Sequence, residues 1–256
     1  MEDWVHRLDV GHRYSYITTE FPDKKQFPRF YEAKRTEIIL EPGDMLFLPA
    51  GWYHWVFSEE PDQETGLNVA VNYWYKGSWN MCMQDRYPPI KTTHNIHKII
   101  DYLKFLETTN VNKLYCSTSN TGTFTLPDSR WIHNDTVKCT DHYLSWKEFY
   151  DKRNSQEHWY LWAFSDRRLQ EYDPKLYDSW EIKSVHWWVN FGHVNTAMHY
   201  DSTDNLLCQM AGRKRLVLFP HSEWPNLYLI NPYPPELIRH VEQQFQKRQL
   251  KQSEDP

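Results

Sequence analysis

Short apolar runs separated by turn residues dominate the first 78 residues. The runs are bounded by prolines and glycines and occupy residues 36–41, 45–48, 52–57 and 67–75. In the last run the odd positions from Leu67 to Tyr73 are apolar or aromatic, while Asn68 and Asn72 lie on the opposite face. Closely spaced short strands of this kind predict a β-sandwich or β-barrel.

The middle of the chain changes to a helical pattern. Isoleucine and leucine recur at helical spacing in residues 94–107, which predicts an amphipathic helix. Residues 117–128 are polar and contain glycine and proline, which predicts a linker. Further on, Ser145 and Glu148 have the spacing of a capping box and predict the start of a short helix.

The last part of the chain returns to β-like runs. Residues 160–164, 185–189 and 197–219 predict strands, with a turn at Gly212, and residues 234–250 have helical spacing. We therefore divide the chain into a first β-rich part at 1–78, a helix and linker at 79–130, and a second β-rich part with a tail helix at 131–256. The overall prediction is a mainly β fold with flanking helices and no internal repeat.

The composition predicts an ordered protein in a reducing compartment. Aromatic residues make up 16% of the 256 residues, which supplies core material although the mean hydropathy is -0.81. The four cysteines have no C-x-x-C spacing, so we expect neither a zinc knuckle nor a disulfide framework. The chain has no apolar stretch of ~18 residues and no apolar N-terminal segment, which predicts a cytoplasmic or nuclear protein without membrane contact. The net charge of -5 argues against a broad nucleic-acid surface.

Candidate chemistry is concentrated in the second β-rich part. His199 and Asp201 are two residues apart, so they share one face if the segment is extended; they could bind a metal or simply pair with each other. Lys214 follows the turn at Gly212 on a facing strand. If it points inward it needs an anionic partner, because an unpaired buried ammonium is costly, whereas the alternative is a solvated turn.

Specific short blocks occur in both β-rich parts. The first part contains Phe21-Pro22-Asp23, Phe27-Pro28-Arg29-Phe30, Glu41-Pro42-Gly43-Asp44, Trp52-Tyr53-His54 and 71–77. The second part contains Tyr160-Leu161, 196–201, Asn205, Gly212-Arg213-Lys214-Arg215 and Leu218-Phe219-Pro220. Together these blocks resemble the jumonji-C class of Fe(II)- and 2-oxoglutarate-dependent oxygenases, and most closely the asparaginyl hydroxylase group typified by factor inhibiting hypoxia-inducible factor. The resemblance covers most of the chain and implies a double-stranded β-helix, the jelly roll of cupins.

The resemblance implies a role for each matching residue. His199, Asp201 and His54 would ligate Fe(II) as a facial triad, which leaves positions for O₂ and for 2-oxoglutarate. Lys214 would bind the distal carboxylate of 2-oxoglutarate together with the hydroxyls of Thr196 and Tyr160, because a cation and two donors satisfy one carboxylate. Asn205 and Asn72 would line the same pocket near the metal. The implied activity is hydroxylation or demethylation of a protein side chain.

The substrate side departs from the asparaginyl hydroxylases. In that group an Arg-Gln pair holds the target amide, and here the matching place reads Arg13-Tyr14. The glutamine that follows the strand tyrosine is replaced by Trp162. We therefore expect a protein or peptide substrate with a different target side chain, bound by Arg13, Tyr14, Trp74 and Trp162.

The two β-rich parts are in inverted order relative to the family, in which the H-x-D strand precedes the distal histidine. Three explanations remain open. The domain could be circularly permuted, the chain could hold halves of two tandem domains, or two chains could exchange half-barrels. In each, residues 1–78 correspond to the C-terminal half of the jelly roll and residues 131–256 to the N-terminal half.

Two alternative functions also remain open. The chain could be a non-catalytic jelly-roll module that binds a peptide, or a cupin with isomerase or lyase chemistry. The latter sites usually contain three histidines and a glutamate and do not require an inward lysine. The tail helix around Leu237, Val241 and Phe245 could pack on the barrel or form a homodimer.

Overall fold

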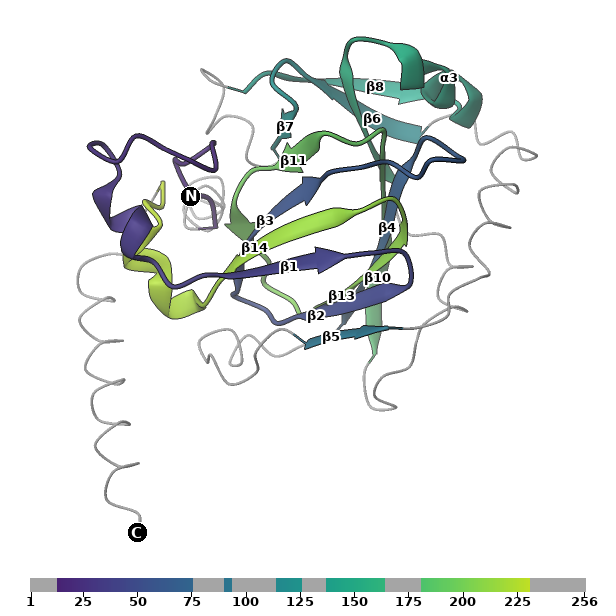
Figure 1. Cartoon of the computed structure of the whole chain (residues 1–256). Coiled ribbons are helices and arrows are strands. Elements are labelled where there is room, and N and C mark those ends of the chain that lie inside the picture. The colour runs from purple at the N-terminus through teal and green to yellow at the C-terminus, as the bar shows by residue number, and fades with distance from the viewer. Residues whose placement is uncertain (1–12, 76–89, 94–113, 126–136, 164–180, 231–256) are drawn as a thin grey trace, which may run out of the picture.

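The computed structural model describes residues 13–75, 90–93, 114–125, 137–163 and 181–230. In this part of the chain two β-sheets are packed against each other (Figure 1). The predicted mainly β fold is confirmed, and its two sheets are consistent with a cupin double-stranded β-helix. None of the helices described is long and apolar enough to cross a bilayer.

The smaller sheet joins strands from opposite ends of the chain. Its order is β1-β14-β3-β11-β7, and β12 also pairs with β3. Its members are β1 (Thr36–Leu40), β3 (Tyr53–Ser58), β7 (Thr123–Phe124), β11 (Val194–Thr196), β12 (His199–Tyr200) and β14 (Lys214–Phe219). The pairs are antiparallel except for β11 with β7.

The larger sheet has eight strands in the order β5-β2-β13-β4-β10-β9-β6-β8. Its members are β2 (Asp44–Leu48), β4 (Asn68–Tyr75), β5 (Ile90–Thr93), β6 (Leu114–Ser119), β8 (Cys139–Leu144), β9 (His158–Ala163), β10 (Ile182–Asn190) and β13 (Asn205–Ala211). Strands from residues 1–78 and from 131–256 alternate at its centre, where β13 lies between β2 and β4. The two parts of the chain therefore share both sheets.

Alternation along the strands divides the core into layers. Between the sheets, Leu46 and Leu207 of the larger sheet pack with Leu216 and Leu218 of the smaller one. On the other face of the smaller sheet, the intervening residues enter a second cluster with the N-terminal segment; they include Tyr53, Trp55, Val217 and Phe219. The predicted alternation in β4 is confirmed, since Leu67, Val69, Val71 and Tyr73 all lie in a third cluster.

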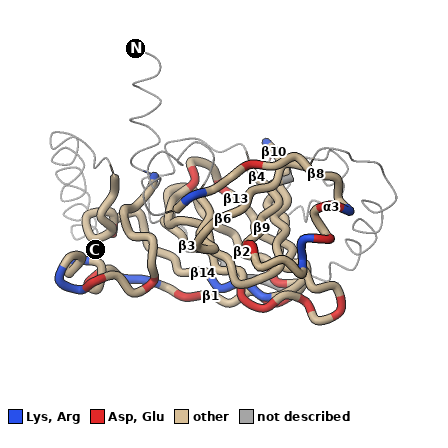
Figure 2. Tube along the Cα trace, turned by 90° about the horizontal axis from the view of Figure 1, so that it is seen from above, with Lys and Arg blue, Asp and Glu red and all other residues tan. Residues whose placement is uncertain are grey.

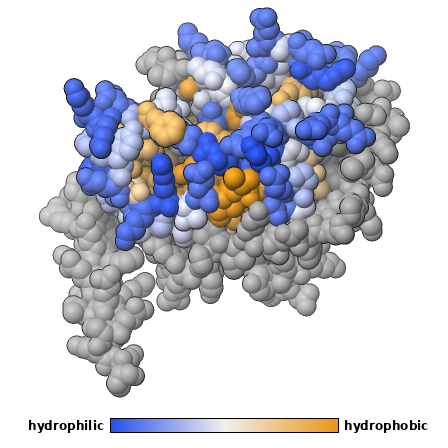
Figure 3. All heavy atoms as spheres, viewed as in Figure 1, coloured by the Kyte–Doolittle hydropathy of each residue, from blue (hydrophilic) through white to orange (hydrophobic). Residues whose placement is uncertain are grey.

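Short helices cap the sheets. They are η1 (Pro28–Glu32), α3 (Trp146–Asp151), η4 (Lys152–Asn154) and η6 (His221–Asn226). The predicted capping box at α3 is confirmed, because Ser145 Oγ accepts from the backbone of Glu148 and the Glu148 carboxylate accepts from the backbone of Ser145. On the face shown in Figure 3, the described residues are mostly hydrophilic and surround an apolar area near the centre.

The linker prediction for residues 117–128 is wrong over its described part. This segment carries the end of β6 and all of β7. Its serines and threonines form strands because their hydroxyls find partners, as where buried Ser119 Oγ donates to the carbonyl of Thr123 at 2.6 Å. The predicted helices at 94–107 and 234–250 lie outside the described residues, so the domain boundaries and the helix-mediated dimer stay predictions.

A close backbone contact joins the two β-rich parts. Gly192, in the turn between β10 and β11, has φ of +83°, and a Cβ there would lie 2.6 Å from the carbonyl oxygen of Glu59 and 2.8 Å from Pro61. Gly66 has a similar φ of +70°, but nothing lies within 4 Å of its Cβ position. Comparing substitutions at these two glycines therefore distinguishes the cost of positive φ from the cost of the steric contact.

We predict that Gly192→Ala lowers the free energy of unfolding more than Gly66→Ala does. Both substitutions place alanine at positive φ, at a cost of about 1–2 kcal/mol. Only Gly192→Ala also pushes apart two packed segments, which adds roughly 1–3 kcal/mol. Urea denaturation of both variants measures the difference, and equal midpoints would show that the contact between residues 59–61 and 192 does not contribute.

Candidate metal centre

One strand pairing brings the two histidines together. His54 on β3 is directly opposite His199 on β12 in antiparallel register, and Tyr53 is opposite Tyr200. The tyrosines turn to the other face, where their rings pack edge to face at 5.2 Å. Because side chains alternate, burial of the aromatic residues in the outer cluster turns both imidazoles inward.

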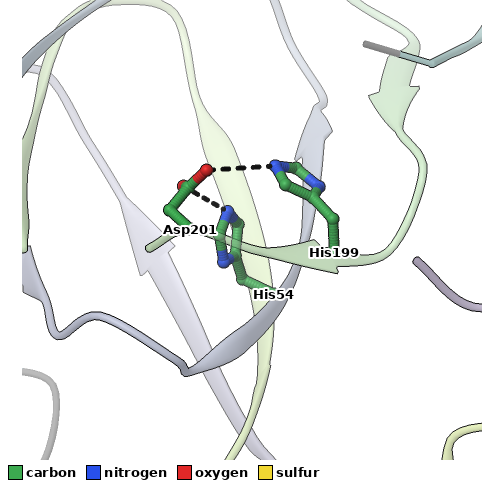
Figure 4. A group of neighbouring side chains, drawn as sticks. All are labelled: His54, His199 and Asp201. Carbon is green, nitrogen blue, oxygen red and sulfur yellow. Dashed lines mark ion pairs between the residues drawn. The ribbon is translucent and has the colours of Figure 1, made fainter. Parts of the chain in front are cut away.

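Asp201 completes a compact group of three ligands. Its carboxylate lies 3.3 Å from His54 Nε2 and 4.0 Å from His199 Nε2 (Figure 4). The candidate ligand atoms of the three residues all lie within 4.8 Å of one another. The structure thus joins residues that are far apart in the sequence, and two imidazoles with one carboxylate form the donor set typical of non-haem Fe(II).

Backbone contacts orient both imidazoles for metal binding. His54 Nδ1 lies 3.0 Å from the carbonyl oxygen of Trp52, and His199 Nδ1 lies 2.7 Å from that of Ala197. A carbonyl can only accept, so each Nδ1 carries a proton toward its carbonyl and each Nε2 is the ring nitrogen that faces Asp201. Such carbonyl contacts commonly fix the tautomer of histidine ligands.

The protonation states also suit a cation. Burial, with His54 close by, lowers the pKa of His199 to about 4. Burial raises the pKa of Asp201, but the hydrogen bond and charge of His54 outweigh it, with smaller contributions from His199 and Arg13, and the pKa lies below its ordinary value. The neutral imidazole of His199 and the ionised carboxylate of Asp201 are forms that bind metal.

The three ligands open into a cavity of about 340 Å³. This volume falls within the range of small-molecule sites. Polar residues of both β-rich parts line it together with aliphatic and indole side chains; the lining comprises Arg13, Leu48, His54, Val56, Asn72, Trp74, Tyr160, His186, Trp188, Thr196, His199, Asp201, Leu207, Lys214 and Leu216.

Lys214 is the buried cation of this cavity. Its side chain is 1% exposed, and Nζ donates to Ser58 Oγ at 2.5 Å. Among the described residues, no carboxylate lies within ion-pair distance of Nζ, and burial lowers the pKa of Lys214 to about 7. A lysine in this environment favours an anionic ligand, because an uncompensated ammonium is costly to bury. The inward orientation considered for Lys214 is therefore confirmed.

Further donors face the same cavity. Buried Thr196 Oγ1 has no hydrogen-bond partner among the described residues. Burial raises the pKa of Tyr160, so its phenol keeps its proton. Of the two predicted asparagines, Asn72 lines the cavity and Asn205 does not; Asn72 Nδ2 donates to the fully buried Asn205 Oδ1 at 2.9 Å. A ligand with several acceptor oxygens would satisfy the hydroxyls of Thr196 and Tyr160.

The residues predicted for the substrate side are only partly brought together. Arg13 and Trp74 line the cavity, whereas Tyr14 and Trp162 do not. Tyr14 forms a β-bridge with His199 and stacks on its ring at 5.7 Å, so it supports the metal ligand from outside the cavity. Trp162 packs on Trp188 at 5.1 Å and on Tyr160 at 5.0 Å, as part of the wall behind these residues.

Sequence reasoning missed two polar residues near the cavity. His186 lines it between Trp74 and Trp188, with ring centroids at 5.9 and 6.1 Å, and the pKa of His186 is lowered mainly by burial. Ser58 contacts the ammonium of Lys214. His186 could have been found from the alternation of β10, since His186 and Trp188 share one face; Ser58 carries no sequence signal of its own.

The chain is similar to proteins of one family. Residues 5–81 and 94–253 match the family described as Cupin-like domain. A putative JmjC domain-containing protein, L887 of Acanthamoeba polyphaga mimivirus, is 20% identical over 251 residues, which is 86% of this chain and 39% of that protein. No solved structure gives a significant match.

Shorter regions of the chain match other relatives at higher sequence identity. Lysine-specific demethylase 8 of Xenopus tropicalis is 36% identical over 66 residues, covering 26% of this chain and 14% of that protein. tRNA wybutosine-synthesizing protein 5 of Danio rerio is 43% identical over 53 residues, covering 21% of this chain and 16% of that protein. All of these matches span well under two thirds of the relatives. They support the jumonji-C resemblance but do not single out the asparaginyl hydroxylase group.

We predict that the purified chain binds one Mn(II) or Fe(II) ion per molecule and that His54→Ala or His199→Ala abolishes tight binding. Each substitution removes one of the three donors. Loss of an outer-shell partner alone typically weakens metal affinity by about 10- to 100-fold, so loss of a direct ligand is expected to weaken it by at least this much. Titration calorimetry with Mn(II) measures the loss. His142→Ala on β8, which leaves the three ligands in place, serves as the control.

The same variants test whether the site forms within one chain. A sample in which His54→Ala and His199→Ala chains are refolded together contains no chain with both histidines. A site built within one chain stays without tight metal binding in this mixture. Recovery of a substantial fraction of the sites would show that half-barrels are exchanged between chains.

Proposed function

Since the chain belongs to the cupin-like domain family, we propose that it is an Fe(II)- and 2-oxoglutarate-dependent dioxygenase that hydroxylates or demethylates a protein side chain. One observation carries the proposal: a buried lysine without a carboxylate partner in the described structure lines the same cavity as a compact His-His-Asp group. A dianion with a chelating end and a distal carboxylate complements both features.

The donor set fits the proposed cofactor and cosubstrate. His54, His199 and Asp201 would hold the iron, and bound iron with 2-oxoglutarate supplies the activation of O₂ needed to hydroxylate an unactivated C–H bond. Lys214 would bind the distal carboxylate, with Thr196 and Tyr160 as neutral donors. The high pKa of Tyr160 matters here, because an ionised phenolate would repel the anion.

The remaining lining residues would position the substrate and keep the cavity dry. Asn72 would orient the metal-bound end of the cosubstrate, and Asn205 would act through Asn72, whose Nδ2 donates to Asn205 Oδ1. The indole of Trp188 donates to Asn72 Oδ1 at 2.8 Å, which fixes this amide. On the substrate side, Arg13 and Trp74 line the cavity and would contact the target side chain, whereas Tyr14 would act through His199.

The names of two relatives favour a protein substrate. Lysine-specific demethylase 8 and Lysine-specific demethylase JMJ31 of Arabidopsis thaliana are 36% and 40% identical to this chain over short regions. The name of tRNA wybutosine-synthesizing protein 5 points to a different substrate class, and the net charge of -5 gives no support to a nucleic-acid target.

The proposal includes a circular permutation of the two halves within one domain. It is supported by the strand order, in which β14 of the second part lies between β1 and β3 of the first, and β13 lies between β2 and β4. Halves of two separate tandem domains would instead each expose unpaired strand edges. The comparisons do not test the order of the halves.

We predict that the wild-type chain, given Fe(II), O₂ and ascorbate, converts 2-oxoglutarate to succinate and that Asp201→Ala does not. Loss of the carboxylate removes one of three iron ligands, while the thermal midpoint changes little because Asp201 lines the cavity and belongs to none of the apolar core clusters. Succinate detection by NMR measures turnover, including the slow turnover without a target. Tight iron binding without turnover, in the presence of candidate peptides, would instead favour the non-catalytic peptide-binding module.

We predict that affinity for 2-oxoglutarate falls as the pH rises above about 7. The pKa of Lys214 is lowered to about 7 in the unliganded protein. Above this pH the Lys214 amine of the free protein is mostly neutral, so it must take up a proton when the anion binds. The apparent affinity then drops by up to roughly tenfold per pH unit. Calorimetry on the Mn(II)-loaded protein at pH 8, in two buffers of different ionisation enthalpy, measures the proton uptake.

Lys214→Met is the matched variant for this experiment. It removes the charge while keeping an unbranched side chain, so affinity is expected to fall by about 2–5 kcal/mol and the proton uptake to disappear. Equal affinity and equal proton uptake in wild type and Lys214→Met would show that the anion does not bind at this lysine.

A further inference from the structure

Ser58 lies directly opposite Lys214 in the smaller sheet. The two residues are register partners on β3 and β14, and their side chains are 3% and 1% exposed. Lys214 Nζ donates to Ser58 Oγ at 2.5 Å. An ammonium has no acceptor, so the serine oxygen must accept this hydrogen bond.

Ser58 is itself fixed by a buried amide. Asn190 Nδ2 donates to Ser58 Oγ at 3.0 Å, and Asn190 Oδ1 accepts from the backbone of Gly192 at 2.9 Å. Asn190 is fully buried on β10, in the larger sheet. The serine oxygen therefore uses both lone pairs, one for Asn190 and one for Lys214, and its position is set from the opposite sheet.

The arginines on either side of Lys214 in the sequence have carboxylate partners. Arg215 Nε lies 2.8 Å from Glu59 and Arg215 Nη1 lies 2.7 Å from Glu20, while Arg213 is paired with Glu59 and Glu60. Figure 2 shows basic and acidic positions interspersed along the side that carries β1 and β14. The partly exposed Arg213 and Arg215 thus meet carboxylates, but the buried Lys214 between them meets a neutral hydroxyl.

We propose that Ser58 is a positioning residue that directs the Lys214 ammonium toward the cavity and leaves its charge uncompensated, so that the site prefers 2-oxo acids with a second carboxylate. One N–H of Lys214 is held by Ser58, and the other two remain for an anion in the cavity. A carboxylate at position 58 would neutralise the lysine, and an apolar residue would leave its direction unset. The proposal rests on the proposed function, because it assumes that a 2-oxo acid occupies this cavity.

The test compares two ligands on the Mn(II)-loaded full chain. 2-Oxoglutarate has a distal carboxylate, whereas 2-oxopentanoate has a methyl group in its place. Calorimetry gives the ratio of their dissociation constants for wild type and for Ser58→Ala. We expect Ser58→Ala to weaken 2-oxoglutarate binding by about tenfold, the effect of one hydrogen bond to a charged group, and to leave 2-oxopentanoate binding unchanged. Ser58→Thr retains the hydroxyl and is expected to restore the ratio.

Ser117→Ala controls for the general effect of removing a buried hydroxyl. Ser117 is fully buried on β6 and donates to Asp141 at 3.0 Å, and it does not line the cavity. We expect this variant to keep the wild-type ratio. A folded Ser58→Ala with the wild-type ratio, or one that loses both ligands equally, overturns the role of Ser58 alone. Failure of the wild-type chain to bind 2-oxoglutarate overturns the proposed function as well.

A second variant keeps the proposal testable if Ser58→Ala does not fold. Ser58→Asp places a carboxylate on the ammonium of Lys214, so 2-oxoglutarate binding is expected to be lost while 2-oxopentanoate is still bound. An unchanged preference for 2-oxoglutarate in Ser58→Asp would show that the charge of Lys214 is not what the ligand recognises.

Discussion

The antiparallel register of β3 against β12 and β14 is the constraint on which the site depends. On the inner face of β3, His54 supplies a candidate metal ligand, Val56 lines the cavity and Ser58 accepts a hydrogen bond from Lys214. On the outer face, Tyr53 and Trp55 are buried with the N-terminal segment. A slip of one residue would exchange the two faces, so burial of these aromatic rings fixes the polar groups that face the cavity.

The cavity combines polar groups whose burial is unfavourable without a ligand. The Lys214 ammonium has only the hydroxyl of Ser58 within the described structure, and Thr196 Oγ1 has no partner there. Elsewhere in the described part of the chain, Gln209 Nε2 donates to Asn68 Oδ1 and to backbone carbonyls, and the unpartnered buried groups include Gln209 Oε1 and the neutral indole N–H of Trp146. Local departures from polar satisfaction are typical of functional sites, where the ligand completes the network.

The sequence was sufficient to predict several central strands and the candidate ligands His199 and Asp201. Alternation in residues 67–75 identified the buried face of β4, and the H-x-D spacing placed His199 and Asp201 on one face. The meeting of His54 with His199 rested on resemblance, because strand pairing over such a distance leaves no local pattern. Side-chain direction outside regular strands was harder to predict. Tyr14 was expected to contact the substrate, but its ring stacks on His199 outside the cavity. Ser58 was missed because a lone serine at a strand end is common. Its role becomes apparent only from its pairing with Lys214 on the opposite strand.

The central claim is that ligands from the two β-rich parts of one chain surround a single ion. Anomalous diffraction from crystals of the Mn(II)-loaded protein tests it most directly. The account predicts one strong peak per chain, about 2.0–2.3 Å from Nε2 of His54, Nε2 of His199 and a carboxylate oxygen of Asp201. A peak bound by only one of the two histidines, or separate peaks at His54 and His199, would contradict it.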